Sequence, residues 1–320
     1  MARIGFVFPG QGAQVVGMGR DLYDHSPAAR KVFDIVDRAC NIAVSQLCFF
    51  GPDEVLKETA NTQPALFAAS VAAYAACREA GLEPGAAAGH SVGEYAALVA
   101  AGSLTVEAGA RLVKARGEAM AHAAHERPGA MAAVLGLDAP TVLQCCQEAN
   151  PTGVVVPANL NAPGQIVISG EAHAVERASE LLKARGAKRV VPLAVSGAFH
   201  SPLMETAVAT LRGVLQLTDV SDPSLPVVQN VTADYARSAD EVKANLAAQV
   251  AGPVRWVETV ERLVGDGVTT FVECGPGSVL TGLIKRIAPG VVCFSVGDTA
   301  SLALAAENAV AGAVLTEDFR

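Results

Sequence analysis

Hydrophobic positions along the chain form two patterns, short apolar runs and longer segments with helical spacing. Short runs bounded by glycine, proline or polar residues predict strands, at residues 4–8, 86–88, 130–135, 154–160, 165–169, 189–194, 269–274 and 291–295. Helical spacing predicts helices at residues 27–39, 53–58, 61–80, 94–101, 105–124, 140–149, 172–185, 201–217, 240–250 and 254–264, one that ends near residue 287, and a C-terminal one. This alternation of strands and helices is typical of an α/β protein with a parallel sheet.

The order of elements changes in the middle of the chain, after Pro128 and Gly129. Between residues 130 and 194 the pattern predicts strand, helix, strand, strand, helix and strand. This βαββαβ order is that of a ferredoxin-like unit. We therefore expect a ferredoxin-like subdomain at residues 128–195, inserted into a larger α/β domain made of residues 1–127 and 196–320.

Composition and charge exclude several classes of protein. The chain has 320 residues, of which 51% are hydrophobic and 18% charged, and this balance is that of a globular protein. A net charge of -8 argues against non-specific nucleic-acid binding. The seven cysteines have neither metal-ligand spacing nor a disulfide framework, so we expect reduced core residues and no metal site. The N-terminal residues do not look like a signal peptide, and no apolar run approaches the roughly 18 residues of a membrane span. We expect a soluble, cytoplasmic protein without a membrane partner.

The sequence Gly89-His90-Ser91-Val92-Gly93 lies between a predicted strand and a predicted helix. In that context G-x-S-x-G predicts a nucleophile elbow, and the glycines leave room for a sharp turn. The N-terminus of the helix that follows favours an anion near the serine. Ser91 is therefore the candidate nucleophile and the larger domain is expected to be hydrolase-like; the alternative is an ordinary glycine-rich turn.

A serine nucleophile needs a base, and His200 is the best candidate among six histidines. It lies in a loop of small residues between a predicted strand and a predicted helix, a common place for catalytic side chains. The alternative is a histidine that only caps the helix. His90 is expected to pack or form a hydrogen bond, and four others are expected at the surface: His25, His122, His125 and His173. No acidic residue stands out as the third member, and a carbonyl group can orient the imidazole instead.

Arg116 lies on the apolar side of its predicted helix, in line with Leu112, Val113 and Met120. A buried guanidinium is costly without an anionic partner. That partner is either an internal carboxylate or the carboxylate of a ligand, which arginine binds well. The Gly10-Gln11-Gly12 loop does not match the dinucleotide fingerprint, so we expect no nicotinamide cofactor.

Seven segments together strongly resemble malonyl-CoA:acyl carrier protein transacylases, in order and over residues 4 to about 295. They are Pro9–Gly12, Asn61–Ala65, Gly89–Glu94, Arg116-Gly117, Asn159 with Asn161–Gln165, Gly197–Ser201 and Glu273–Gly277. The resemblance implies the same division into a large α/β domain and a ferredoxin-like insert. It also implies ping-pong transfer of a malonyl group from malonyl-CoA to the phosphopantetheine thiol of an acyl carrier protein. No bound cofactor is implied, and we expect a monomer.

The resemblance also implies roles for individual residues. Ser91 would carry the malonyl group as an ester, and His200 would act as base and then as acid. The carbonyl of Gln249 would orient His200. The backbone N–H groups of Gln11 and Val92 would form the oxyanion hole.

Three further residues would bind the acyl group. Arg116 would hold the malonyl carboxylate, Asn159 would line the pocket, and Phe199 would crowd a branch at the acyl α-carbon and so favour malonyl over methylmalonyl groups.

Other functions remain open at this point. A stand-alone malonyl acyltransferase of a polyketide synthase would share the same chemistry. A serine esterase or thioesterase would share the elbow, and a non-catalytic carrier-binding protein would use neither Ser91 nor His200. Because carrier proteins are usually acidic, docking would need a basic patch, for which two groups qualify: Lys183, Arg185, Lys188 and Arg189, or Lys285 and Arg286.

Overall fold

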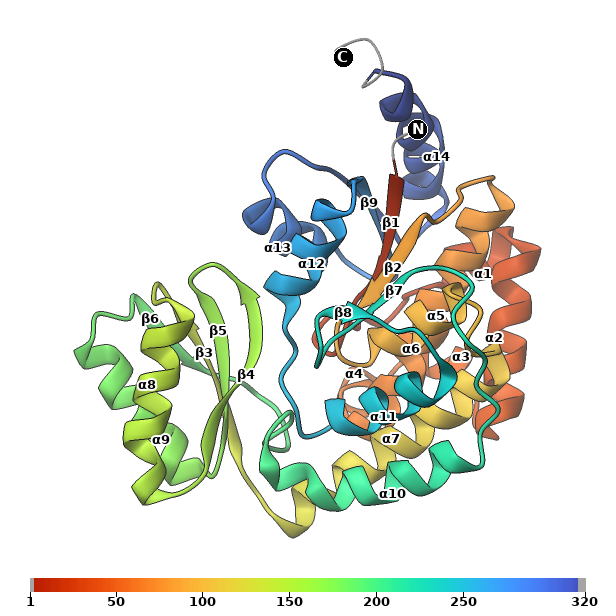
Figure 1. Cartoon of the computed structure of the whole chain (residues 1–320). Helices are drawn as coiled ribbons and strands as arrows, with labels where there is room; N and C mark the ends of the chain where they lie inside the picture. Colours follow the sequence, from red (N-terminus) through yellow and green to blue (C-terminus); the bar gives the residue numbers. More distant parts are fainter. Residues whose placement is uncertain (1–2, 316–320) are drawn as a thin grey trace.

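The larger sheet has six strands, in the order β10-β9-β1-β2-β7-β8. Figure 1 shows β9, β1, β2, β7 and β8 of this sheet. We describe residues 3–315 of the chain from a computed structural model. The strands are β1 (Arg3–Phe8), β2 (Ala86–Gly89), β7 (Val227–Gln229), β8 (Asp234–Tyr235), β9 (Val268–Cys274) and β10 (Val292–Val296). Neighbouring strands are parallel except for β8, which runs antiparallel to β7. The mixed α/β architecture with a parallel sheet is therefore confirmed.

Alternate residues of β1 point to opposite faces of this sheet, as strand geometry requires. Phe6 and Phe8 enter the larger core, whereas Val7 enters the smaller one. Helices that contribute to the larger core are α1 (Arg20–His25), α2 (Pro27–Cys40), α3 (Val44–Phe50), α4 (Asp53–Leu56), α5 (Thr59–Glu79), α6 (Gly93–Ala100), α7 (Val106–Glu126), α10 (Glu205–Gln216), α11 (Ala239–Gln249) and α14 (Thr299–Leu315). The smaller core is covered by α12 (Trp256–Gly265) and α13 (Val279–Ile287).

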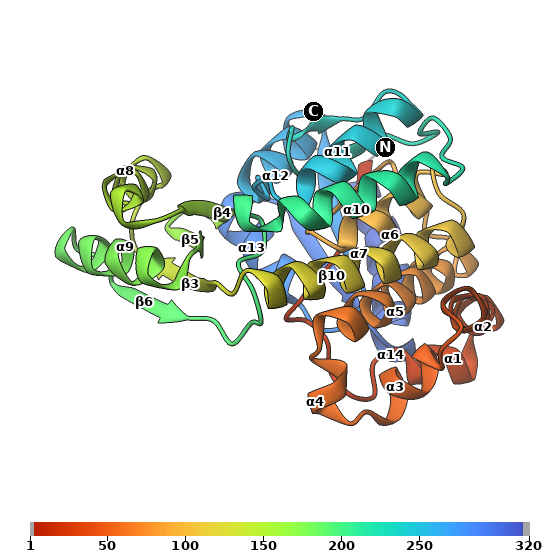
Figure 2. The same cartoon turned by 90° about the horizontal axis from the view of Figure 1, so that it is seen from below.

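The middle of the chain forms a second sheet of four antiparallel strands, in the order β4-β5-β3-β6. Its elements are β3 (Ala130–Leu135), α8 (Ala139–Ala149), a 3-10 turn (Asn150–Thr152), β4 (Val155–Ala162), β5 (Gln165–Gly170), α9 (Ala172–Ala184) and β6 (Arg189–Pro192). Ala132, Val134 and Ile168 face α8 and α9, which lie on the side away from the larger sheet (Figures 1 and 2). Met131 and Val167 point the other way and line a cavity that also contains Ser91.

Several elements differ from the sequence expectation. The short pair β7 and β8 and the helices α1 and α3 were not predicted. Helix α12 begins at Trp256, two residues late, because Val254 forms a parallel β-bridge with Asn159. The expected helix at 201–217 begins with a 3-10 turn at Pro202–Met204 before α10.

All seven cysteines are free; six of them are buried, as expected of core residues, and Cys293 is half-buried. Among the helices of residues 3–315, none is long and apolar enough to cross a bilayer.

Candidate active site

Ser91 lies on a sharp turn between β2 and α6, with a backbone φ of 52°. That left-handed conformation is strained for a non-glycine residue and is often found at functional sites. The flanking glycines make the turn possible. A Cβ on Gly89 would lie 2.0 Å from backbone atoms of Gly93, and one on Gly93 would lie 2.1 Å from the carbonyl oxygen of Phe8. The strand–turn–helix context expected around Ser91 is present.

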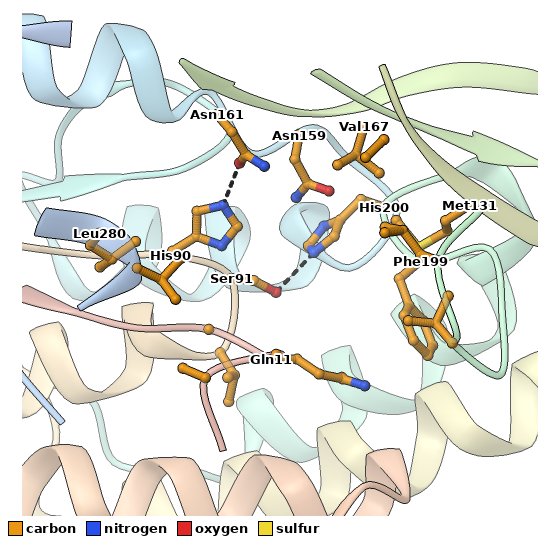
Figure 3. Close-up of a pocket in the computed structure, with 18 of the residues that line it drawn as sticks. Gln11, His90, Ser91, Met131, Asn159, Asn161, Val167, Phe199, His200 and Leu280 are labelled. Atoms are coloured by element: carbon orange, nitrogen blue, oxygen red, sulfur yellow. Dashed lines mark hydrogen bonds between the residues drawn. The ribbon is translucent and has the colours of Figure 1, made fainter. Parts of the chain in front are cut away.

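The Ser91 hydroxyl faces His200 in a buried position (Figure 3). Ser91 Oγ lies 2.8 Å from His200 Nε2. His200 comes from the segment that returns from the small sheet to α10, and it also has a left-handed backbone, with φ 58°. Two residues 109 positions apart are therefore within hydrogen-bond distance.

Backbone carbonyl groups hold the other ring nitrogen of His200. Nδ1 lies 2.8 Å from the carbonyl oxygen of Gln249 and 3.1 Å from that of Gly252. Because a carbonyl can only accept, Nδ1 carries the proton, and the lone pair of Nε2 faces the Ser91 hydroxyl. Burial, with a smaller contribution from the Arg116 charge, lowers the pKa of His200 to about 3, so the ring is neutral at pH 7. The second carbonyl, from Gly252, was not anticipated.

Arg116 is buried as expected, and its guanidinium reaches Ser91. Nη2 donates to Ser91 Oγ at 3.1 Å and to Gln249 Oε1 at 2.9 Å, and Nη1 donates to Gln63 Oε1 at 2.7 Å. All three acceptors are uncharged. Nε is buried without a hydrogen-bond partner among residues 3–315. Burial lowers the pKa of Arg116, an effect that the nearby Tyr95 and Glu94 oppose.

Asn230, which follows β7, forms hydrogen bonds with the turn that carries Ser91. Its Nδ2 donates to the carbonyl of Gly89 at 2.7 Å, and its Oδ1 accepts the Ser91 N–H at 2.8 Å. The backbone N–H of Asn230 donates to the buried Glu94 at 2.8 Å, and Gln249 Nε2 donates to the same carboxylate at 2.9 Å. Asn230 was not identified from the sequence, because the three-residue strand before it has no readable pattern.

Gln11 and Val92, the two residues expected to form the oxyanion hole, line the cavity beside Ser91. Val92 precedes the first turn of α6, and Gln11 lies in the loop after β1. Both residues line the cavity, and within residues 3–315 neither backbone N–H has a hydrogen-bond acceptor. Free donors in this position can stabilise an oxyanion.

The cavity that contains Ser91 has a volume of about 360 Å³ and lies between the two sheets. Asn159 from β4 and Phe199 from the return segment line it, as do Met131 and Val167 (Figure 3). Mixed polar and apolar walls of this kind suit an acyl thioester.

The other histidines match their expected places. His90 points away from Ser91, where Nε2 lies 2.8 Å from Asn161 Oδ1 and the ring meets the edge of Trp256. The remaining four are exposed: His25, His122, His125 and His173.

The candidate basic patches differ in their position relative to the cavity. Arg286 donates to Gln165, a cavity-lining residue, and to the carbonyl of Pro163. Arg185 instead forms an ion pair with Glu148 on the outer helix layer.

Comparison with known sequences places this geometry in a family. A sequence profile described as "Acyl transferase domain" matches residues 5–310. The malonyl CoA-acyl carrier protein transacylase of Bacillus subtilis (strain 168) is 46% identical over 309 residues, which cover 96% of this chain and 98% of that protein. The protein of the same name from Escherichia coli (strain K12) is 42% identical over 308 residues, covering 96% and 100%.

Solved structures agree with the sequence matches. An acyl-carrier-protein S-malonyltransferase from Burkholderia pseudomallei 1710b has a TM-score of 0.92 and 44% identity, covering 95% of this chain and 99% of that one. A malonyl-transacylase solved in complex with a holo type II PKS acyl-carrier protein has a TM-score of 0.93 and 44% identity, covering 96% and 100%. The chain therefore belongs to the acyl transferase family, among the malonyl-CoA–acyl carrier protein transacylases.

Proposed function

We propose that the chain transfers a malonyl group from malonyl-CoA to the phosphopantetheine thiol of an acyl carrier protein, through an ester on Ser91. The observation that carries this proposal is the position of Ser91 Oγ, 2.8 Å from the base nitrogen of His200 and 3.1 Å from the guanidinium of Arg116. A nucleophile, its base and a cation for a free carboxylate thus meet in one cavity. The names of the relatives support the same activity.

In the first half-reaction, His200 Nε2 takes the hydroxyl proton as Ser91 Oγ bonds to the thioester carbon. The carbonyl oxygen becomes an oxyanion that accepts hydrogen bonds from the backbone N–H groups of Gln11 and Val92. When the carbonyl re-forms, the carbon–sulfur bond breaks and the CoA sulfur receives the proton from His200. The carbonyls of Gln249 and Gly252 keep the imidazole in the required tautomer throughout.

The second half-reaction reverses these steps with a different thiol. His200 takes the proton of the phosphopantetheine thiol, whose sulfur attacks the ester carbon. The bond between that carbon and Ser91 Oγ then breaks, and the proton returns to Oγ. The malonyl group leaves as a thioester of the carrier.

Arg116 would bind the free carboxylate of the malonyl group. Acylation turns the Ser91 hydroxyl into an ester oxygen, a poorer acceptor, while the nearby Nη2–H remains directed toward the acyl group. An acyl group without a carboxylate leaves this buried cation without an anion, which disfavours it. Asn159 and Phe199 would form walls of the acyl site, with Phe199 crowding an α-methyl branch.

We further infer that residues 1–127 and 196–320 form a hydrolase-like domain and residues 128–195 a ferredoxin-like one. The order β4-β5-β3-β6 in the small sheet and the elbow after β2 support this description. For carrier docking, Lys285 and Arg286 are the better of the two basic groups, because Arg286 bonds to the cavity-lining Gln165. Since the whole site comes from one chain, we propose that a monomer is sufficient.

The test is intact-mass analysis after mixing with malonyl-CoA, followed by addition of holo carrier protein. We expect one malonyl increment that is absent in Ser91→Ala and that moves to the carrier. A serine esterase or thioesterase would instead lose the increment to water without a thiol. Pairing the loaded enzyme with carriers of fatty-acid and polyketide synthesis would show which pathway it serves, and a type II polyketide carrier is the partner in one structural relative.

A further inference from the structure

Glu94 is a fully buried acid in the first turn of α6, and the mechanism above assigns it no part. Its carboxylate accepts three hydrogen bonds, from Gln229 Nε2 at 3.0 Å, the Asn230 N–H at 2.8 Å and Gln249 Nε2 at 2.9 Å. All three partners are donors, which suits an ionised carboxylate, an acceptor only. Burial raises the pKa of Glu94, and the three donors together with Arg116 oppose that effect.

Gln249 connects Glu94 to the reacting groups, and its amide has only one workable orientation. Nε2 faces three acceptors: the Ser91 carbonyl at 3.0 Å, Glu94 Oε2 at 2.9 Å and Asn230 Oδ1 at 3.3 Å. Oε1 faces Arg116 Nη2 at 2.9 Å. The reversed amide would set its oxygen against three oxygens and its NH2 against a guanidinium, so every partner would be lost.

We infer that Glu94 is a positioning residue that fixes the amide of Gln249 and, through it, the guanidinium of Arg116. Of the three acceptors around Gln249 Nε2, Glu94 Oε2 is the nearest, at 2.9 Å, and the same oxygen is held in place by the backbone N–H of Asn230. Its consequence is selectivity for acyl groups that end in a carboxylate, since Arg116 must stay beside Ser91 to meet them. This consequence rests on the proposed function.

Two substitutions of Glu94 separate the hydrogen bonds from the charge. Glu94→Gln can keep an oxygen toward Asn230 and Gln249 if the amide of Gln229 reverses. The reversal needs the amide of the half-buried Asn245 to turn as well, and it gives up only the long bond of 3.4 Å from Gln229 Nε2 to the carbonyl of Val242. Glu94→Met has a similar volume and keeps no acceptor, which leaves Gln249 Nε2 without its nearest partner.

The measurement is the ratio of kcat/KM for acylation of Ser91 by malonyl-CoA to that by acetyl-CoA. We expect Glu94→Met to lower the ratio at least tenfold and Glu94→Gln to stay within threefold of the unmodified protein. The inference is overturned if folded Glu94→Met keeps the ratio, or if both variants lower it equally, which would assign the effect to charge alone. Glu273→Met is the matched control, since Glu273 is also buried and accepts the N–H groups of Leu280 and Thr281 outside this network. It should lower the melting temperature without changing the ratio.

A double-mutant cycle tests whether Glu94 acts through Gln249. Gln249→Met keeps the backbone carbonyl that holds His200 and should lower the ratio as much as Glu94→Met does. Adding Glu94→Met to it should change the ratio no further; multiplicative effects would show that Glu94 acts independently. If Glu94→Met does not fold, an unchanged ratio in Gln249→Met is by itself sufficient to overturn the inference. The same cycle can be measured as free energies of urea unfolding. That measurement needs no acyl donor, so its outcome does not depend on the proposed function. An unmodified protein that takes no malonyl group contradicts the proposed function, whereas additive unfolding energies contradict the positioning role.

Discussion

Arg116 binds three uncharged acceptors while it lies fully inside the protein. A buried cation held in this way has unused capacity for an anion, because amide and hydroxyl oxygens offset only part of its desolvation. The sequence had left open whether an internal acid neutralises this residue. The nearest acid in its network is Glu94, which meets the guanidinium only through Gln249.

Replacing Arg116 by alanine should therefore change acyl preference more than folding. We expect kcat/KM with malonyl-CoA to fall about 10- to 100-fold relative to acetyl-CoA, since hydrogen bonds to charged groups contribute about 1.5–3 kcal/mol. Acylation rates with both donors measure the ratio. Arg111→Ala is the control, because Arg111 lies on the exposed side of the same helix and pairs with Glu107. Equal losses with both donors would contradict the assigned role of Arg116.

His200 should make stability depend on pH. Burial lowers the pKa of the folded state to about 3, below the ordinary value of 6.5, so between these values the unfolded chain binds more protons. Stability should then rise with pH through this window and be lost as pH falls through it, by up to about 1.4 kcal/mol per pH unit. Burial of His90 acts in the same direction.

Urea unfolding at pH 5 and pH 7 provides the measurement. The variant His200→Leu should show a smaller difference between the two pH values than the unmodified protein. Equal differences would mean that His200 is not held neutral by burial.

At the scale of secondary-structure elements, the turn after β2 depends on its two glycines. Gly93→Ala would place a methyl group 2.1 Å from the carbonyl oxygen of Phe8, a contact with backbone that side-chain motion cannot relieve. We expect little or no folded protein, measured by yield and by urea unfolding. Gly282→Ala is the control within a helix, with nothing within 4 Å, and should stabilise the fold by about 0.5–1 kcal/mol. A normally stable Gly93→Ala protein would show that the turn can rearrange.

The sequence predicts elements that have a clear apolar pattern, including the four-residue β2, but not the shortest strands. The elbow, the buried face of α7 and the βαββαβ order follow from spacing alone, and Ser91, His200 and Arg116 follow from those elements. Strand β7 has three residues and β8 has two, too few for any period to appear. Asn230 follows β7 directly, so its bonds to the elbow could not be foreseen, and neither could the carbonyl of Gly252.

At the scale of the whole molecule, the exposed Lys285 and Arg286 lie on α13, the helix whose Leu280 and Leu283 line the cavity. The net charge is -8, so an acidic carrier would be repelled except where cations gather. Lys285→Glu should raise the KM for the carrier several-fold and leave transfer to free pantetheine unchanged. Initial rates at two salt concentrations measure both effects, because salt screens the attraction between the acidic carrier and Lys285 but does not affect transfer to free pantetheine. Lys183→Glu on α9 is the control. A larger rise in the KM for the carrier with this variant would indicate that the carrier docks on the smaller sheet instead.

The parts that complete the site come from segments far apart in the order of synthesis. Ser91 is made early, but its base is residue 200, and the carbonyls that orient this base belong to residues 249 and 252. On the ribosome, the emerging chain therefore carries an unactivated alcohol until more than three quarters of the protein has left the exit tunnel. We therefore expect a chain that ends before residue 249 not to consume thioesters, because its Ser91 has no oriented base.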